Sequence, residues 1–557
     1  MRRLPLWVLL GLILLQPTPH RVSQTVAGDL GDSMFLTWTL SWGAHGLRND
    51  PMSVFDANIF HPEPQTLALS DPMLSLAPFF GLLEWITGDS IVALNVLMFA
   101  LFVGALSAAH ALAMRLFGRG DVALVVAVVA CCNSYVFGQQ NHPQLQTFGF
   151  LSLSFLLLLR AVEYRRVRDG AWLGLAIVAM TLANVYYGLF WVLCAVVVVA
   201  MLWLQGVLPS VRSLLPSGLT AVAVVAAVLG PVMRIYLEVD ERNGLTRGYE
   251  PSNSLLPTDL ITPQRDNWSW GTALDDINSF GKAGEHPFFP GFVAMALGVV
   301  GLLVGWRLVR RGVSWVRTGI RSEELLALVV AGAVAVVFAL GPSPGGFKGP
   351  FRALHRWVPG FDGVRVTSRF TVVAFIALAL LVGLAYQHLA DRLPAGRRRW
   401  LALGIVVVVM VEVGGPMARV DVPEGDRVAV YEAIAERPDG AVLELPMRTQ
   451  VAGGSWAFVE APRMYHATWD WNPRVNGYSG SAPAGFADLA ALLNTWPADD
   501  AERRLDELEV RYIVLHGGVE QRTPALSPAD QERLVAEARA LGYTAEAHGE
   551  DWLIVRE

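Results

Sequence analysis

The sequence predicts an α-helical polytopic membrane protein with about 11 transmembrane helices and a C-terminal extracytoplasmic α/β domain. Of its 557 residues, 53% are hydrophobic and only 17% are charged, unlike an ordinary soluble chain. Apolar runs long enough to cross the hydrocarbon recur from Leu4 to Pro416 and then stop. Residues 417–557 carry 24 acidic residues against 13 arginines, a net charge of −11. We therefore divide the chain into a transmembrane domain, 1–416, and a soluble domain, 417–557.

The count of eleven spans depends on the arginines between them. We predict spans at about 4–17, 93–114, 121–138, 145–161, 171–186, 188–206, 216–236, 289–307, 324–341, 370–389 and 400–416. With this count, every arginine-rich loop lies on the cytoplasmic side, as the positive-inside rule requires. The long outer loops are then about 18–92, 237–288 and 342–369. A cleaved signal peptide is the alternative for the first span. We expect a multi-pass protein of the plasma membrane.

One apolar segment does not fit this topology as a span. Residues 72–87 contain two prolines and Glu84. Counted as a span, they would place the later arginine clusters outside. We therefore expect a helix lying in the outer interface, with a re-entrant helix as the alternative.

The soluble domain alternates helical and extended patterns. Helices are expected over 427–436, 501–508 and 529–541, and strands over 441–445, 510–515 and 552–555. This order is typical of a small α/β domain.

Two carboxylates follow the first span directly. Asp29 and Asp32 lie in the stretch GDLGD, on the side opposite the basic N-terminus. A carboxylate in this place can act as a general base at the outer surface. The alternative is structural, because Asp is a favoured N-cap and a helix is expected over 33–47.

Several short motifs resemble a known superfamily. They are GDLGDSMFLTWTLSWGAHGL and FDANIFHPEPQTLALSD in the first outer loop, then SYVFGQQNHPQLQ, NVYYG and GEHPFFPG, and finally VLELP and NGYSG in the tail. In this order, over about residues 20–517, the chain resembles bacterial polytopic membrane proteins related to the GT-C glycosyltransferases. Lipid A aminoarabinose transferases and protein O-mannosyltransferases are better-known relatives of that group.

The resemblance implies a membrane transferase that uses a polyprenyl-phosphate-linked sugar. In that superfamily an acidic residue of the first outer loop deprotonates the acceptor hydroxyl or binds a metal. The role would fall on Asp32 or Asp29, with a divalent metal as the possible cofactor. The Asp-Glu dipeptide of the mannosyltransferases is absent here. The NGYSG turn has a structural alternative, which is to shape the tail.

The leaving phosphate gains negative charge during such a transfer, so cations should face it. Arg365 and Arg369, before the span at 370, are the best candidates because arginine binds phosphate oxygens in a bidentate manner. Lys348, Arg352 and Arg356 share their loop. The alternative for Arg365 and Arg369 is anchoring to anionic lipid head groups.

Four further residues are candidates for binding substrate, each with a structural alternative: Asp71 (cap of a helix starting at Pro72), His61 (a hydrogen-bonded interfacial histidine), Tyr187 (an aromatic belt at the interface) and Glu285 (a plain loop residue).

The leading hypothesis is an outer-face glycosyltransferase that moves a sugar from a polyprenyl-phosphate-linked donor to a cell-envelope acceptor. No Walker-type or GxGxxG loop suggests a nucleotide cofactor, and no basic surface suggests nucleic acid. The expected partners are the donor, the acceptor and membrane lipids. One rival is a flippase for lipid-linked sugars, although intramembrane charge is sparse apart from Glu412. The other is a non-catalytic envelope assembly factor of the same fold.

Overall fold

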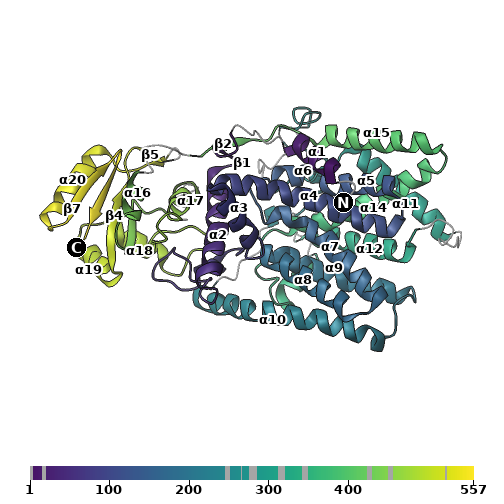
Figure 1. Cartoon of the computed structure of the whole chain (residues 1–557), viewed down its shortest axis with the longest axis horizontal. Helices are drawn as coiled ribbons and strands as arrows, with labels where there is room; N and C mark the ends of the chain where they lie inside the picture. The colour runs from purple at the N-terminus through teal and green to yellow at the C-terminus, as the bar shows by residue number, and fades with distance from the viewer. Residues whose placement is uncertain are drawn as a thin grey trace. The chain divides into compact units, whose positions relative to one another are not determined.

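The computed structural model describes residues 4–15, 21–244, 251–264, 266–274, 285–310, 320–341, 349–422, 429–449, 456–520 and 523–556. The chain folds into two compact units (Figure 1). The first, here the helical unit, comprises Met1–Thr18, Leu97–Val232 and Thr246–Met417. The second, here the mixed unit, comprises Pro19–Val96, Met233–Leu245 and Ala418–Glu557. The segment predicted as the first outer loop therefore shares a compact unit with the C-terminal residues. Lys348 lies outside the described residues.

The helical unit is built almost entirely of apolar helices. They are α1 (Leu4–Leu15), α4 (Ser90–Phe117, from Leu97 onward), α5 (Gly120–Cys131), α6 (Ser134–Gly138), α7 (Gly149–Tyr164), α8 (Val167–Ala183), α9 (Val185–Leu204), α10 (Val211–Asn243, as far as Val232), α11 (Phe292–Arg310), α12 (Ser322–Ala339), α13 (Phe351–Trp357), α14 (Thr371–Ala390) and α15 (Ala395–Val413), with 3-10 turns η3 (Leu145–Phe148), η4 (Pro251–Asn253), η5 (Pro257–Ile261) and η8 (Thr367–Phe370).

Each of the eleven predicted spans overlaps helix among the described residues, although the span 121–138 is divided between α5 and α6. Among the described residues, seven helical segments are long and apolar enough to cross a membrane, and α1 and α5 are shorter apolar helices. The polytopic helical fold is thus confirmed, whereas the number of crossings stays a prediction. Helix α14 is the most enclosed of the seven and packs on α5, α11 and α12. Small residues permit this packing, since a Cβ on Gly301 of α11 would lie 2.0 Å from the Leu381 carbonyl oxygen.

Glu412, the charge noted within the last span, caps another helix of the same unit. Its Oε2 accepts a hydrogen bond of 3.0 Å from the Val293 N–H at the start of α11, where the helix dipole favours an anion. Gly291 leaves room for it, because a Cβ there would lie 2.9 Å from Oε2, and its φ of +93° also favours glycine. The final glycine of the GEHPFFPG motif is explained in this way.

The mixed unit combines a four-stranded sheet with helices from both ends of the chain. Its elements are β1 (Thr25–Ala27), α2 (Leu30–Asn49), η2 (Thr66–Leu69), α3 (Ala77–Thr87), β2 (Arg419–Asp421), α16 (Ala429–Ala435), β3 (Ala441–Leu445), α17 (Trp456–His466), α18 (Phe486–Leu493), α19 (Asp499–Glu507), β4 (Val510–Leu515), β5 (Val519–Glu520), β6 (Thr523–Pro524), α20 (Pro528–Ala540), β7 (Thr544–His548) and β8 (Asp551–Val555).

The sheet has the order β3-β4-β8-β7, with β3 and β4 parallel and the other pairs antiparallel. The predicted α/β character of the tail is therefore confirmed; the sequence prediction did not include β7, α17 or α18. The early segment is joined to the tail within this unit, for example where β1 pairs with β2 and where α2 packs against α17.

The segment 72–87 is helical, but only from Ala77 onward. Its N-cap is Leu76, and a proline occupies the first turn. The interpretation of Asp71 as the cap of a helix starting at Pro72 is therefore wrong. Phe80 is buried, whereas the Trp85 side chain is 77% exposed, so α3 presents an apolar face, as expected for an interfacial helix.

Candidate functional site

The predicted site residues fall in both units. Asp29, Asp32, His61 and Asp71 belong to the mixed unit, and Tyr187, Glu285, Arg365 and Arg369 belong to the helical unit.

Asp29 is the N-cap of α2. Its backbone is extended, and its Oδ1 accepts a hydrogen bond of 3.0 Å from the Asp32 N–H. The helix begins at Leu30, three residues earlier than expected. The capping interpretation thus holds for Asp29.

Asp32 lies in the first turn of α2, where its side chain is partly accessible. The positive end of the helix dipole stabilises a carboxylate at this place. The Tyr478 hydroxyl contacts Asp32 Oδ1 at 3.4 Å as a hydrogen-bond donor. A carboxylate that is oriented by a neighbour and still accessible has the properties of a general base.

Tyr478 is a residue that sequence reasoning did not select. Its ring makes edge-to-face contacts with Phe35, at 5.2 Å between centroids, and with Trp456, at 4.9 Å. It belongs to the NGYSG motif, so this motif and GDLGD meet in the mixed unit. The NGYSG motif drew attention to this stretch, but nothing in the sequence showed which carboxylate its tyrosine would contact.

The two other candidates of the mixed unit differ in their surroundings. His61 joins the early segment to the tail through two contacts. Its ring Nε2 lies 3.1 Å from the Leu508 carbonyl oxygen, and its backbone N–H donates to the Arg474 carbonyl oxygen at 2.8 Å. This matches the hydrogen-bonded alternative for His61. Asp71 lies in a partly buried loop before α3.

In the helical unit, Glu285 and Arg369 form a bidentate ion pair. Arg369 Nη2 lies 2.5 Å from Glu285 Oε1, and its Nε lies 3.3 Å from Oε2. The guanidinium also stands over the Tyr186 ring, 5.7 Å from its centroid. Arg365 is exposed, and its backbone N–H donates to the Tyr186 hydroxyl at 2.9 Å. Tyr186 thus contacts the guanidinium of Arg369 and the backbone of Arg365.

Tyr187 does not belong to an aromatic belt. Its side chain is fully buried, and its hydroxyl donates to the Leu145 carbonyl oxygen at 2.8 Å. The belt interpretation is therefore wrong for this residue, because a belt tyrosine faces the interface. Tyr187 instead joins the start of α9 to η3.

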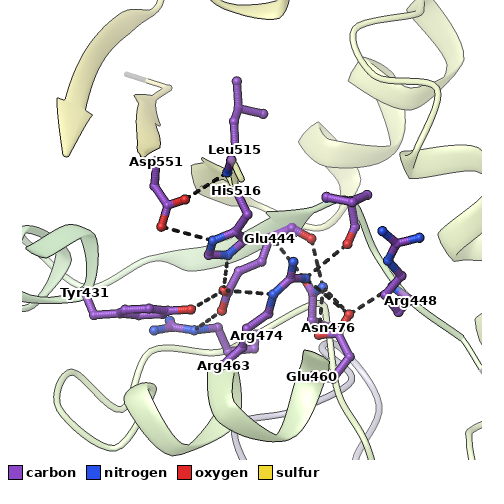
Figure 2. A network of polar contacts seen from close by, with 12 residues as sticks. Tyr431, Glu444, Arg448, Glu460, Arg463, Arg474, Asn476, Leu515, His516 and Asp551 are labelled. Carbon is purple, nitrogen blue, oxygen red and sulfur yellow. Dashed lines mark hydrogen bonds and ion pairs between the residues drawn. The ribbon is translucent and has the colours of Figure 1, made fainter. Parts of the chain in front are cut away.

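The mixed unit also contains a buried network of polar side chains around Glu444 of the VLELP motif (Figure 2). The sequence did not predict this network. Glu444 Oε2 accepts hydrogen bonds from Tyr431 at 2.7 Å and from His516 at 2.8 Å, and Oε1 lies 3.3 Å from Arg474 Nε. Asn476 binds the Glu444 backbone twice, with its Oδ1 accepting from the N–H and its Nδ2 donating to the carbonyl. Both tail motifs therefore stabilise the sheet domain.

The pKa values of this network make the mixed unit sensitive to acid. Burial alone would raise the pKa of Glu444, but His516, Arg474 and Arg463 outweigh it and lower the pKa to about 2. Burial lowers the pKa of His466 to about 4. Both groups have lower pKa values in the folded chain than in the unfolded chain. At low pH the unfolded chain therefore binds more protons than the folded chain, and the folded state loses stability.

We therefore expect the mixed unit to lose stability progressively as the pH falls from about 6.5 toward 2, first through His466 and then through Glu444. Hydrogen exchange of β3 and β4 in the full-length protein, corrected for the intrinsic rate at each pH, measures this loss. His466→Phe should remove the part between about pH 6.5 and 4. A free energy of opening that stays constant down to pH 3 would contradict the assignment.

A divalent metal has no evident ligand set here. Among the described residues, no three His, Cys, Asp or Glu side chains form a group that could hold a metal ion, and the Asp29 carboxylate caps α2. A divalent metal as cofactor therefore stays a prediction.

Comparisons with known proteins give structural similarity alone. No protein-family model matches the chain, and no curated protein matches it. Among solved structures, it is similar to ArnT from Cupriavidus metallidurans bound to undecaprenyl phosphate, with a TM-score of 0.43 and 12% identity over 99% of this chain and 97% of that chain. The apo state of the same protein gives a TM-score of 0.39 and 14% identity over 98% and 97%. These similarities assign no donor, acceptor or activity to this chain.

Proposed function

We propose that the chain is a membrane glycosyltransferase that moves a sugar from a polyprenyl-phosphate-linked donor to a cell-envelope acceptor on the outer face. The observation that carries the proposal is the Asp32 carboxylate, partly accessible at the start of α2 and contacted by Tyr478. Asp29 has a structural role as a cap, so Asp32 is the candidate base.

The chemistry follows from these groups. The acceptor hydroxyl oxygen attacks the anomeric carbon and its proton passes to the Asp32 carboxylate. The bond between the anomeric carbon and the phosphate oxygen breaks, and the electron pair leaves with the polyprenyl phosphate. Within the helical unit, taken by itself, Arg365 and Arg369 are the candidates for binding a polyprenyl phosphate. Tyr478 would act as a positioning residue by fixing the orientation of Asp32.

The flippase rival has less support from the residues. Transporters use polar groups near the membrane midplane to bind their cargo. Glu412, the intramembrane carboxylate noted in the sequence, is occupied as the cap of α11. The non-catalytic rival is separated from our proposal by experiment.

The test compares envelope glycans and lipid-linked sugars in a deletion strain, complemented with the wild type or with Asp32→Asn. We expect the deletion to remove one glycan modification and only the wild type to restore it. Restoration by both proteins would favour the assembly factor. Accumulation of intact donor on the inner leaflet would favour the flippase.

A further inference from the structure

His286 has hydrogen-bond acceptors at both ring nitrogens. Its Nδ1 lies 3.0 Å from Asp259 Oδ2, its Nε2 lies 2.9 Å from the Ser252 carbonyl oxygen, and only 2% of the residue is exposed. A neutral imidazole carries one N–H, whereas a carboxylate and a carbonyl oxygen only accept. Both contacts are therefore hydrogen bonds only when His286 is the imidazolium cation.

These bonds tie two segments of the helical unit together. Asp259 also accepts from the Leu256 N–H at 2.7 Å, and its carbonyl oxygen accepts from the Phe288 N–H at 3.1 Å. The segment around η5 is thus joined to residues 286–288, immediately before α11. Release of His286 would loosen this junction.

The residue next to His286 is Glu285, which holds Arg369 at two points. Within the described part of the chain, both of these bonds use Nε and Nη2 of Arg369, and Nη1 is left for another anion. Among the described residues, Asp259 from η5 and Glu285 from its own segment are acidic groups that raise the pKa of His286. The hydrogen bond that His286 donates to Asp259 is the main reason that the pKa of His286 is raised above 6.5.

We infer that His286 is a positioning residue, which as a cation fixes Glu285 and so orients Arg369 toward the phosphate of a polyprenyl phosphate. The inference rests on the proposed function. When the pH rises through the raised pKa, His286 becomes neutral and keeps only one of its two bonds. The positive charge near Glu285 is lost and Glu285 is held less firmly. Both effects weaken the binding of the phosphate.

The test measures the dissociation constant of undecaprenyl phosphate for the full-length protein in nanodiscs, from pH 5 to pH 9. The lipid phosphate also titrates near pH 6, so His286→Gln serves as the reference. We expect the wild type to bind at least about fivefold more tightly than His286→Gln at low pH, with the two converging at high pH. Asp259→Asn removes the carboxylate that raises the pKa of His286. In this background the dissociation constants should become equal at a lower pH. His45→Gln, a histidine of α2 in the mixed unit, should behave as the wild type.

A second readout separates this inference from the proposed function. Hydrogen exchange of the amides of residues 286, 288 and 289, measured without lipid, should be faster in His286→Gln than in the wild type at pH 6 and equal at pH 9. If no protein binds the lipid at any pH, the proposed phosphate contact fails and the exchange result alone decides the role of His286. Equal exchange, or identical binding profiles for wild type and His286→Gln, would overturn the inference.

Discussion

Asp32→Asn should lower the rate of sugar transfer by about 10²–10⁴-fold while leaving the fold intact. Asparagine keeps the shape of the side chain and can still bind the Tyr478 hydroxyl, but it cannot accept the acceptor's proton. The loss should appear in kcat, because the carboxylate acts in the transition state and not in holding the donor. Initial rates of glycan transfer by purified full-length protein measure it.

Asp29→Asn is the matched control. Asparagine caps helices as well as aspartate does, so this variant should keep α2 and transfer at close to the wild-type rate. The two substitutions remove the same charge three residues apart on the same helix. Equal loss in both variants would assign the effect to charge or stability, and the role of Asp32 as base would fail.

Arg474→Met should destabilise the mixed unit by about 3–5 kcal/mol. Arg474 is 1% exposed, and its Nη2 lies 2.6 Å from Asp470 Oδ2. Its removal leaves Asp470 and Glu444 as buried carboxylates without this cation. The free energy of opening, from hydrogen exchange of β3 and β4 in the full-length protein, measures the loss.

Two further variants sharpen this prediction. Arg503→Met removes an exposed arginine that pairs with Asp500 on α19, and its effect should stay within about 0.5 kcal/mol. Adding Asp470→Asn to Arg474→Met should recover part of the loss, because one stranded charge is then removed. A loss below about 1 kcal/mol in Arg474→Met alone would show that the ion pairs around Arg474 do not stabilise the sheet domain.

The fold was predictable where it depends on local pattern. Apolar runs located the eleven helical segments, and alternation of helix and strand patterns located β3, β4 and α20. The start of α3 was not predictable, because Pro72 and Pro78 both suit a first helical turn; the structure uses the second. Strand β7 was also missed, since its residues 544–548 are partly exposed and lack a strong apolar pattern.

The candidate site was predictable in its residues but not in its partners. The acidic pair and the arginines were found from their place beside predicted spans. Contacts across long sequence separations, such as Tyr478 with Asp32 and Arg369 with Glu285, leave no local signal. The Glu444 network was missed for the same reason: its members are far apart in the sequence.

The most direct test of the account is turnover of the lipid donor by the purified full-length protein in proteoliposomes. Polyprenyl-phosphate-linked pentoses and hexoses would be supplied with envelope acceptors, and released polyprenyl phosphate quantified by mass spectrometry. The account predicts acceptor-dependent release of polyprenyl phosphate by the wild type, with none above background from Asp32→Asn. Release at the same rate by both proteins, or intact donor moved across the bilayer without release, would contradict it.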